Sequence, residues 1–215
     1  MGTTKTMTAT IEVFADISCP FTHVGLKVIA AEIQAANMPV QLQVRAWPLE
    51  WVNGSPLEAA GVAEKVAALG LQLDIGGAFD GFQPEDWPNT TIPALNLVDA
   101  AYQRDAATGF AVSIRLRNVL FEEGGNVADN HVLADVADEF ELSNPGPDPA
   151  AGVLGDYAEG QRRGVSGSPD FWIDGHEFFC PSLDIGHGTD GSLTVSFDDD
   201  GLRQLVRNLQ TPPPG

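Results

Sequence analysis

The residues with the clearest potential for covalent chemistry are Cys19 and the proline that follows it. Cys19 comes after residues 10–16, a run rich in β-branched and aromatic types, and directly before Pro20. Proline is favoured at the first position of a helix, because its missing N–H would be unpaired there. Cys19 is therefore predicted at a helix N-terminus, where free backbone N–H groups and the helix dipole favour a nucleophilic thiolate. The alternative is a cysteine that is only buried.

Two polar residues follow Cys19 within about one helical turn. Thr22 is expected to donate a hydrogen bond to the Cys19 sulfur, with an ordinary helical threonine as the alternative. His23 shares a helical face with Cys19, and it is expected to stabilise the thiolate or to move a proton. The alternative for His23 is a solvent-exposed histidine of the first turn. Cys19 and His23 are only two ligands, so no metal site is predicted.

Composition excludes several classes of protein. The chain has 215 residues, 43% of them hydrophobic, and no apolar run approaches the roughly 18 residues that span a bilayer. A net charge of −19 repels phosphate backbones and anionic lipids, so neither nucleic acid nor a membrane is an expected partner. The N-terminal residues lack the pattern of a secretory signal, and a cytoplasmic location is expected. Two cysteines are too few for a disulfide scaffold.

Hydrophobic periodicity predicts the elements that position Cys19. Residues 10–16 are predicted as a buried strand, 21–36 as a helix with a broad apolar face, and 40–47 as a second strand. A strand, helix, strand unit of this kind has parallel strands and a right-handed crossover. Cys19 then lies where the first strand gives way to the helix.

A helical insertion is predicted over residues 55–147, between two turn-rich seams at 52–56 and 143–149. Residues 1–54 and 148–215 are predicted to form one discontinuous α/β core, a mixed sheet flanked by helices. The aromatic residues of the segment near residues 79–87 are expected on a loop that covers a cleft. Four tryptophans are expected to line that cleft, or else to be core residues: Trp47, which we predict to contact substrate, Trp51, Trp87 and Trp172.

Three short segments and the order of elements resemble the DsbA-like branch of the thioredoxin superfamily. The segments are Phe-Ala-Asp-Ile-Ser-Cys-Pro-Phe at 14–21, Leu-Phe-Glu-Glu-Gly at 120–124 and Gly-Val-Ser-Gly-Ser-Pro at 164–169. They are most similar to FrnE-like and 2-hydroxychromene-2-carboxylate isomerase-like proteins, which are related to kappa-class glutathione transferases. The resemblance covers nearly the whole chain and implies a thioredoxin-like fold.

The resemblance also implies roles for individual residues. Pro169 is expected to have a cis peptide bond and to lie against Cys19, while the Ser168 backbone receives the substrate. Pro20 and Phe21 are predicted as further substrate contacts. FrnE-like proteins carry Cys-x-x-Cys, but here Thr22 replaces the second cysteine, so a dithiol cycle within the motif is excluded. Kappa-class transferases and chromene carboxylate isomerases have serine in place of the first cysteine, so this chain lies between the two patterns.

The second cysteine, Cys180, is expected near the first. Asp174-Gly175 is a strong signal for a two-residue hairpin turn, and extending the ladder from it places Cys180 opposite Pro169. Cys180 would then lie roughly 5 to 10 Å from Cys19. It is a candidate resolving thiol, with a small buried residue at a strand end as the alternative.

The leading functional prediction is a cytoplasmic thiol-disulfide oxidoreductase with a single active cysteine and no tightly bound cofactor. Glutathione or mycothiol would be its co-substrate, and a disulfide or an electrophile its other substrate. The alternatives are a transferase or isomerase that uses a bound thiol, and a binding module without catalysis. The sequence does not set the oligomeric state, and a homodimer stays open.

Overall fold

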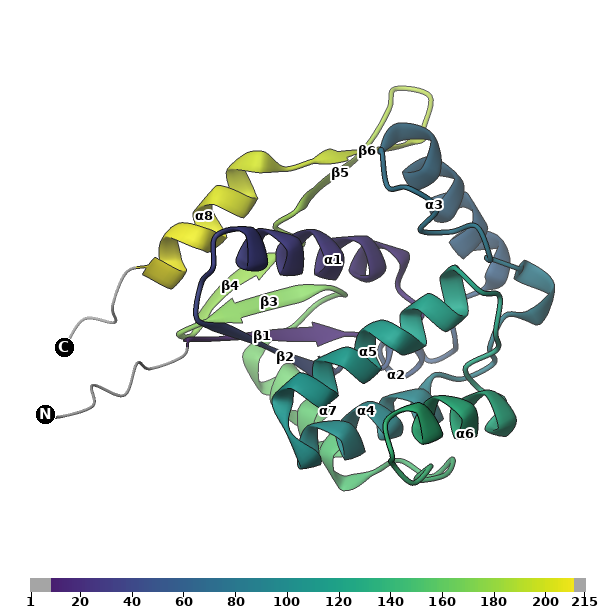
Figure 1. Ribbon diagram of the computed structural model, residues 1–215. Helices are drawn as coiled ribbons and strands as arrows, with labels where there is room; N and C mark the ends of the chain where they lie inside the picture. The colour runs from purple at the N-terminus through teal and green to yellow at the C-terminus, as the bar shows by residue number, and fades with distance from the viewer. Residues whose placement is uncertain (1–8, 211–215) are drawn as a thin grey trace, which may run out of the picture.

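A computed structural model describes residues 9–210 of the chain; the remaining residues of the predicted core, 1–8 and 211–215, lie outside this range. The elements are β1 (Ala9–Ala15), α1 (Pro20–Ala35), β2 (Val40–Ala46), α2 (Leu49–Asn53), α3 (Ala59–Gln72), the 3-10 helix η1 (Pro84–Asp86), α4 (Ile92–Arg104), α5 (Ala106–Phe121), α6 (Asn130–Glu139), α7 (Ala151–Arg163), β3 (Asp170–Ile173), β4 (His176–Phe179), β5 (Leu183–His187), β6 (Leu193–Phe197) and α8 (Asp199–Gln210) (Figure 1).

The central sheet has the strand order β2-β1-β3-β4. β1 and β2 are parallel, with Val13 opposite Val44, which confirms the predicted strand, helix, strand unit. β3 is antiparallel to both β1 and β4. Asp174 and Gly175 turn the chain between β3 and β4 with φ of 47° and 81°, values that glycine and aspartate tolerate best. β5 and β6 form a separate antiparallel pair.

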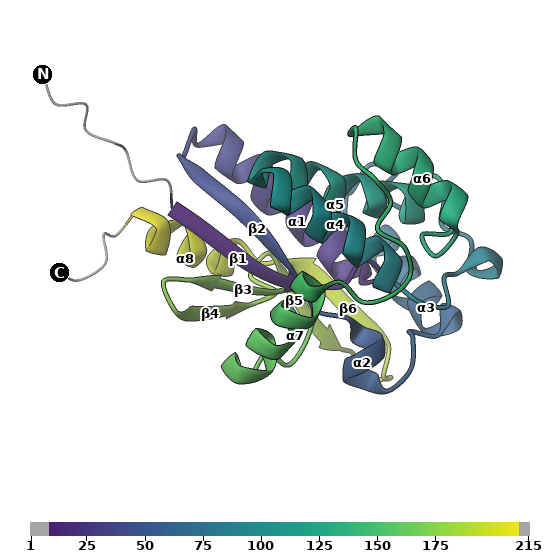
Figure 2. The same ribbon diagram turned by 90° about the horizontal axis from the view of Figure 1, so that it is seen from below.

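Helices cover both faces of this sheet, as Figure 2 shows, with α7 on the opposite side from α1 and α5. Side chains of α1, α5 and α8 pack on the face that contains Val13, Leu42 and Phe171. The other face carries Phe14, which packs with Trp47 beneath α7. The mixed α/β fold predicted from the sequence is confirmed.

The segment between β2 and β3 is mostly helical, and α4, α5 and α6 share a hydrophobic core. The predicted helices of the insertion are therefore present, while the exact limits of core and insertion stay a prediction. Asp16 joins the two parts, because its carboxylate accepts hydrogen bonds from the Leu49 N–H at 2.6 Å and from the Thr91 hydroxyl at 3.1 Å. Within residues 9–210, no helix is long and apolar enough to cross a membrane.

The tryptophans fall into two separate aromatic groups, and the alternative that they are core residues fits Trp47, which is 3% exposed. Trp47 and Trp51 both contact the ring of Tyr157, with ring centroids 5.1 and 5.0 Å apart. Trp172 lies beneath the guanidinium of Arg163. Trp87 lies in the segment before α4 and contacts the rings of Phe82 and Phe121.

The loop before α4 packs on the insertion rather than covering an open cleft. Phe79, Phe82 and Trp87 each contact the ring of Phe121 at the end of α5, with ring centroids between 5.4 and 6.3 Å apart. Aromatic pairs at such distances are favourable beyond the area that they bury. The loop is thereby fixed next to the N-terminal half of α1.

Candidate active site

Cys19 is the N-terminal cap of α1, as predicted. Its backbone is extended, with φ of −81° and ψ of 113°, and Pro20 occupies the first helical position. The Cys19 carbonyl accepts the first helical hydrogen bond, from the N–H of His23 at 3.1 Å. The residue is only 4% exposed, so a partner that reaches its sulfur must be small or must displace a covering group.

The segment that follows α7 lies against the Cys19 sulfur. Helix α7 ends at Gly164, where φ is 82°, and the chain then reaches a cis peptide bond between Ser168 and Pro169, as the resemblance implies. The Cys19 thiol donates to the Ser168 carbonyl, with Sγ and O 2.9 Å apart. Cys19 and the Ser168–Pro169 segment are therefore adjacent, as predicted.

Thr22 does not make the predicted contact with the Cys19 sulfur. Its side chain is fully buried, and its Oγ1 lies 2.8 Å from Ser168 Oγ in a hydroxyl pair. Ser168 Oγ also accepts a hydrogen bond from the Asp16 N–H at 3.0 Å. Thr22 therefore ties α1 to the cis-proline segment, and it affects Cys19 through Ser168.

His23 is buried rather than solvent-exposed, so the alternative of an exposed first-turn histidine is wrong. Its Nε2 donates to the Ala78 carbonyl at 2.9 Å, and its ring lies between Phe79 and Phe121. Burial, and after it the neighbouring Lys27 charge, lowers the pKa of His23 to about 3. His23 is therefore neutral near pH 7. Because its N–H already donates to the Ala78 carbonyl, His23 fixes the loop that carries Ala78.

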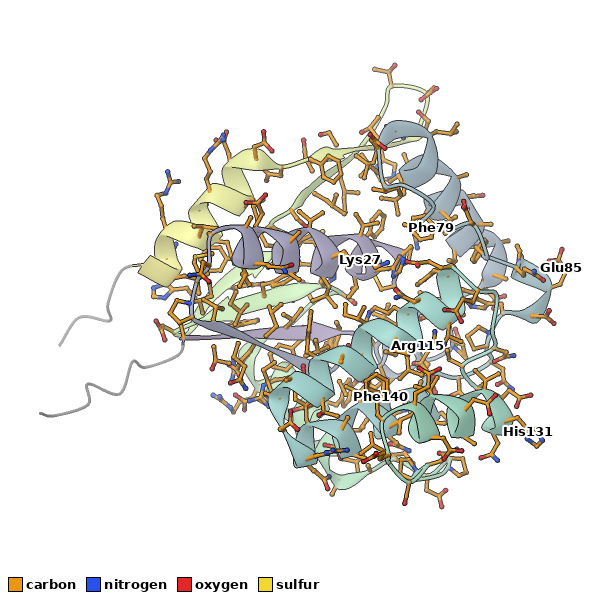
Figure 3. The ribbon with its side chains drawn as sticks, viewed as in Figure 1. Lys27, Phe79, Glu85, Arg115, His131 and Phe140 are labelled. Atoms are coloured by element: carbon orange, nitrogen blue, oxygen red, sulfur yellow. The ribbon has the colours of Figure 1, made fainter. Side chains whose placement is uncertain are left out.

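Glu122 completes the surroundings of His23 on the solvent side. Its Oε1 lies 3.3 Å from His23 Nε2 and also accepts a hydrogen bond from Lys27 Nζ. Figure 3 shows Lys27 on α1, close to Phe79 and to the C-terminal end of α5, which Glu122 follows. The segment of residues 120–124 singled out in the sequence therefore packs against α1 beside the candidate site.

Asp16 is a residue of the site that sequence reasoning quoted only within a longer segment. Its Oδ1 accepts hydrogen bonds from both the N–H and the hydroxyl of Ser18 at 2.8 Å, immediately before Cys19. Asp16 is 1% exposed, and its second carboxylate oxygen accepts from Leu49 of α2 and from Thr91, the residue before α4, as described above. Asp16 therefore holds the turn that presents Cys19 to the helix N-terminus.

Cys180 lies opposite Pro169, in the predicted register. Its N–H donates to the Pro169 carbonyl at 3.2 Å, and its φ of 43° marks a sharp change of chain direction after β4. Both cysteines are free thiols. Burial raises the pKa of Cys180 to about 12, and the nearby Cys19 contributes to the rise. Cys180 is therefore a protonated, weakly nucleophilic thiol near neutral pH.

The remaining predicted contacts divide between the site and the core. Pro20 is buried at the start of α1, and the half-buried Phe21 packs against the cluster that contains Cys180. Trp47 is 3% exposed beneath α7, and a Cβ added at Gly160 would come within 2.5 Å of its ring. Trp47 is therefore a core residue, and its predicted contact with substrate is not supported.

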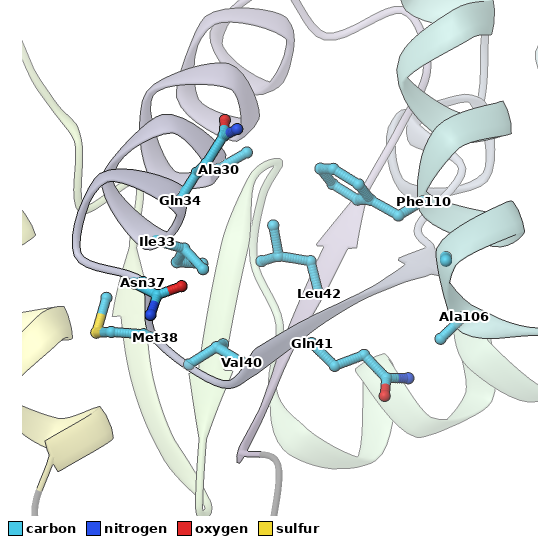
Figure 4. A pocket seen from close by; sticks show the side chains of 11 residues that line it. Ala30, Ile33, Gln34, Asn37, Met38, Val40, Gln41, Leu42, Ala106 and Phe110 are labelled. Carbon is cyan, nitrogen blue, oxygen red and sulfur yellow. The ribbon is translucent and has the colours of Figure 1, made fainter.

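Neither a metal centre nor the hollow at the far end of α1 coincides with Cys19. Among residues 9–210, no three His, Cys, Asp or Glu side chains are placed to share a metal ion. A hollow of about 430 Å³ lies at the far end of α1, lined mainly by apolar side chains of α1, β2 and α5 that include Ile33, Val40 and Phe110 (Figure 4). It contains none of the predicted site residues.

Residues 10–190 match the family model described as the DSBA-like thioredoxin domain. The chain belongs to this family. This DsbA-like protein has no match among curated proteins. Its structure is similar to that of a probable DsbA oxidoreductase from Streptomyces coelicolor, with 17% identity, a TM-score of 0.64, and coverage of 96% of this chain and 92% of the other.

Two further structures show the same fold. The cytosolic disulfide reductase DsbM from Pseudomonas aeruginosa, solved with glutathione, has 17% identity and a TM-score of 0.56, with 94% of this chain and 100% of the other covered. A 2-hydroxychromene-2-carboxylate isomerase has 12% identity and a TM-score of 0.57, with 78% and 87% covered. At these identities the similarity establishes the fold, and the chemistry must be argued from the DsbA-like protein's own residues.

Proposed function

We propose that this DsbA-like protein is a thiol-disulfide oxidoreductase that uses Cys19 as its single nucleophile and a low-molecular-weight thiol as co-substrate. The observation that supports this most is the position of the Cys19 sulfur, at the first turn of α1 and 2.9 Å from the Ser168 carbonyl. That arrangement places the sulfur at a helix N-terminus, next to the cis-proline segment.

In the proposed reaction, the Cys19 thiolate attacks one sulfur of a disulfide and expels the other sulfur as a thiolate. Cys19 is then half of a mixed disulfide. A small thiol, such as glutathione or mycothiol, attacks this mixed disulfide in its thiolate form and releases Cys19. Cys19 is regenerated and supplies no net electrons. One half of the substrate disulfide leaves as a thiolate, and the other half leaves as a disulfide with the small thiol, which is that thiol's own disulfide when the substrate is glutathionylated or mycothiolated. A reducing compartment such as the cytoplasm would keep the cycle running.

Two features favour a small thiol over Cys180 in the second step. Thr22 stands where a resolving cysteine would be, and the raised pKa of Cys180 leaves little thiolate at pH 7. The low exposure of Cys19 also favours a small co-substrate, because little of its surface can be reached by a folded protein. The Cys180 route is the competing possibility, and a Cys180→Ala variant would abolish it.

The test is turnover of a glutathionylated and a mycothiolated model disulfide, each with the matching free thiol as reductant. The protein and its Cys180→Ala variant are expected to reduce at least one of them, and Cys19→Ser is expected to reduce neither. Loss of turnover in Cys180→Ala would assign the second step to that residue. Conjugation of chlorodinitrobenzene without disulfide reduction would instead indicate a transferase, and inactivity in all assays a binding module.

A further inference from the structure

Arg117 on α5 is a buried cation behind the N-terminal end of α1. Its side chain is fully buried. Nη2 donates to the Asp16 carbonyl at 3.0 Å, and Nη1 donates to the carbonyl and hydroxyl of Ser113 at 2.8 and 2.5 Å. All three acceptors are uncharged. Among the ion pairs within residues 9–210, none includes Arg117.

Burying a guanidinium without a carboxylate partner costs free energy. The groups whose pKa depends on its charge therefore indicate what compensates that cost. Burial lowers the pKa of Arg117 to about 10, while the charges of Asp16, Cys19 and Tyr102 raise it, and the side chain is a cation at pH 7. Burial raises the pKa of Tyr102 to about 12, so its phenol is neutral. Of the three described residues whose charge raises the pKa of Arg117, Asp16 and Cys19 are then left to carry a negative charge.

The charge of Arg117 also acts on His23, near the start of α1. After burial and the charge of Lys27, it contributes to the lowered pKa of His23. The other ionisable groups around this turn are the salt-bridged pair Lys27 and Glu122 on the solvent side and the protonated thiol of Cys180. Among the described residues, Arg117 is the only Lys or Arg side chain that is fully buried, and its hydrogen bond to the Asp16 carbonyl fixes it to the turn that leads into Cys19.

We propose that Arg117 is a positioning residue that stabilises the Cys19 thiolate by its charge and holds the Asp16 turn by its hydrogen bond. The inference rests on the proposed role of Cys19 as a nucleophile. A helix N-terminus contributes only about half a unit charge, whereas a buried guanidinium adds a full one at low effective dielectric. Because α5 lies within the predicted insertion, the insertion would supply part of the active site.

The experiment measures the rate of iodoacetamide alkylation of Cys19 across pH, in a Cys180→Ala background with one thiol. Arg117→Met and Arg117→Gln remove the charge, and glutamine retains donors for the Asp16 carbonyl. Arg117→Lys keeps the charge, and Ser113→Ala is the matched control that removes only one acceptor. We expect the midpoint of the alkylation profile to rise by about one pH unit in the two neutral variants. It should stay near the parent value in Arg117→Lys and Ser113→Ala.

The outcomes separate this inference from the proposed function. A parent midpoint equal to that of a free cysteine contradicts the proposed nucleophile itself. A low parent midpoint that is unchanged in a folded Arg117→Met or Arg117→Gln variant, checked by circular dichroism, overturns the role of Arg117 alone. If both neutral variants fail to fold, Arg117→Lys decides, because a rise of about one unit despite the retained charge rejects the electrostatic role.

Discussion

The hydroxyls of Thr22 and Ser168 lie 2.8 Å apart, although 146 residues separate them in the chain. Ser168 belongs to the segment whose carbonyl receives the Cys19 thiol, so the pair links both sides of the candidate site. Thr22 stands at the position of the second cysteine in a Cys-x-x-Cys motif. Its hydroxyl makes a buried hydrogen bond there instead. A substitution at this position tests whether the rest of the site still supports dithiol chemistry.

Thr22→Cys is expected to create a reversible disulfide between residues 19 and 22. The new sulfur would lie one helical turn from Cys19, the spacing of the Cys-x-x-Cys motif. Intact-mass analysis after mild oxidation should show the loss of two hydrogens. A single turnover should also complete without added glutathione, because the new thiol resolves the mixed disulfide, whereas continued turnover still needs a reductant for the 19–22 disulfide. Thr22→Ser is the matched control, because it keeps the hydroxyl and should form no such bond. Oxidised Thr22→Cys protein with two free thiols at residues 19 and 22 would contradict the expectation.

Cys180 is expected to resist alkylation in the folded protein. A raised pKa of about 12 keeps its thiol protonated throughout the range from pH 6 to 9, and its burial excludes the reagent. In a Cys19→Ser variant, a thiol-reactive dye at pH 8 should label the folded protein slowly and the denatured protein completely. Equal labelling of the two states would show that Cys180 is accessible, and it would revive the resolving role.

Local signals predicted the elements that surround the site. Proline at position 20 located the start of α1 and so the cap position of Cys19. The turn at Asp174 and Gly175 set the register of β3 and β4, and that register placed Cys180 opposite Pro169. Such signals act through the backbone of a few adjacent residues, so they can be recognised without knowledge of the packing.

Contacts between distant segments could not be predicted in the same way. Thr22 pairs with Ser168 because the cis-proline segment approaches α1, and no pattern near residue 22 indicates this. The sequence does not single out Arg117, because arginines are usually exposed and its burial depends on how α5 packs against β2 and α1. The short helix α2 and the pair β5 and β6 were not predicted either, since brief elements carry few periodic positions.

His23 is expected to make the protein less stable as the pH falls. Its pKa is about 3 in the folded state and about 6.5 in the unfolded state, so only the unfolded state binds the proton between these values. The free energy of unfolding should fall from about pH 6 towards pH 4, by at most roughly 1.4 kcal/mol per pH unit from this group. Urea unfolding at several pH values should show a smaller dependence in His23→Gln, which keeps a donor for the Ala78 carbonyl. Parallel curves for the two proteins would contradict this assignment.

Gly81 lies where the loop before α4 packs against the backbone that follows α5. A Cβ added there would lie 2.2 Å from the Glu122 carbonyl carbon and 2.4 Å from the Glu123 nitrogen, and both atoms belong to the backbone. Gly81→Ala must therefore displace the loop that carries Ala78 and Phe79, the partners of His23. We expect the free energy of unfolding to fall by about 1–3 kcal/mol, the usual cost of overpacking.

Gly70→Ala on α3 is the matched control for this substitution, because its added Cβ would meet no atom within 4 Å. Alanine is a better helix former than glycine, so this variant should be more stable by up to about 1 kcal/mol. Urea unfolding followed by circular dichroism measures both variants. Opposite changes in the two are the expected result. A Gly81→Ala protein as stable as the parent would show that the loop can move away from α5 at little cost, and His23 would then not depend on that contact.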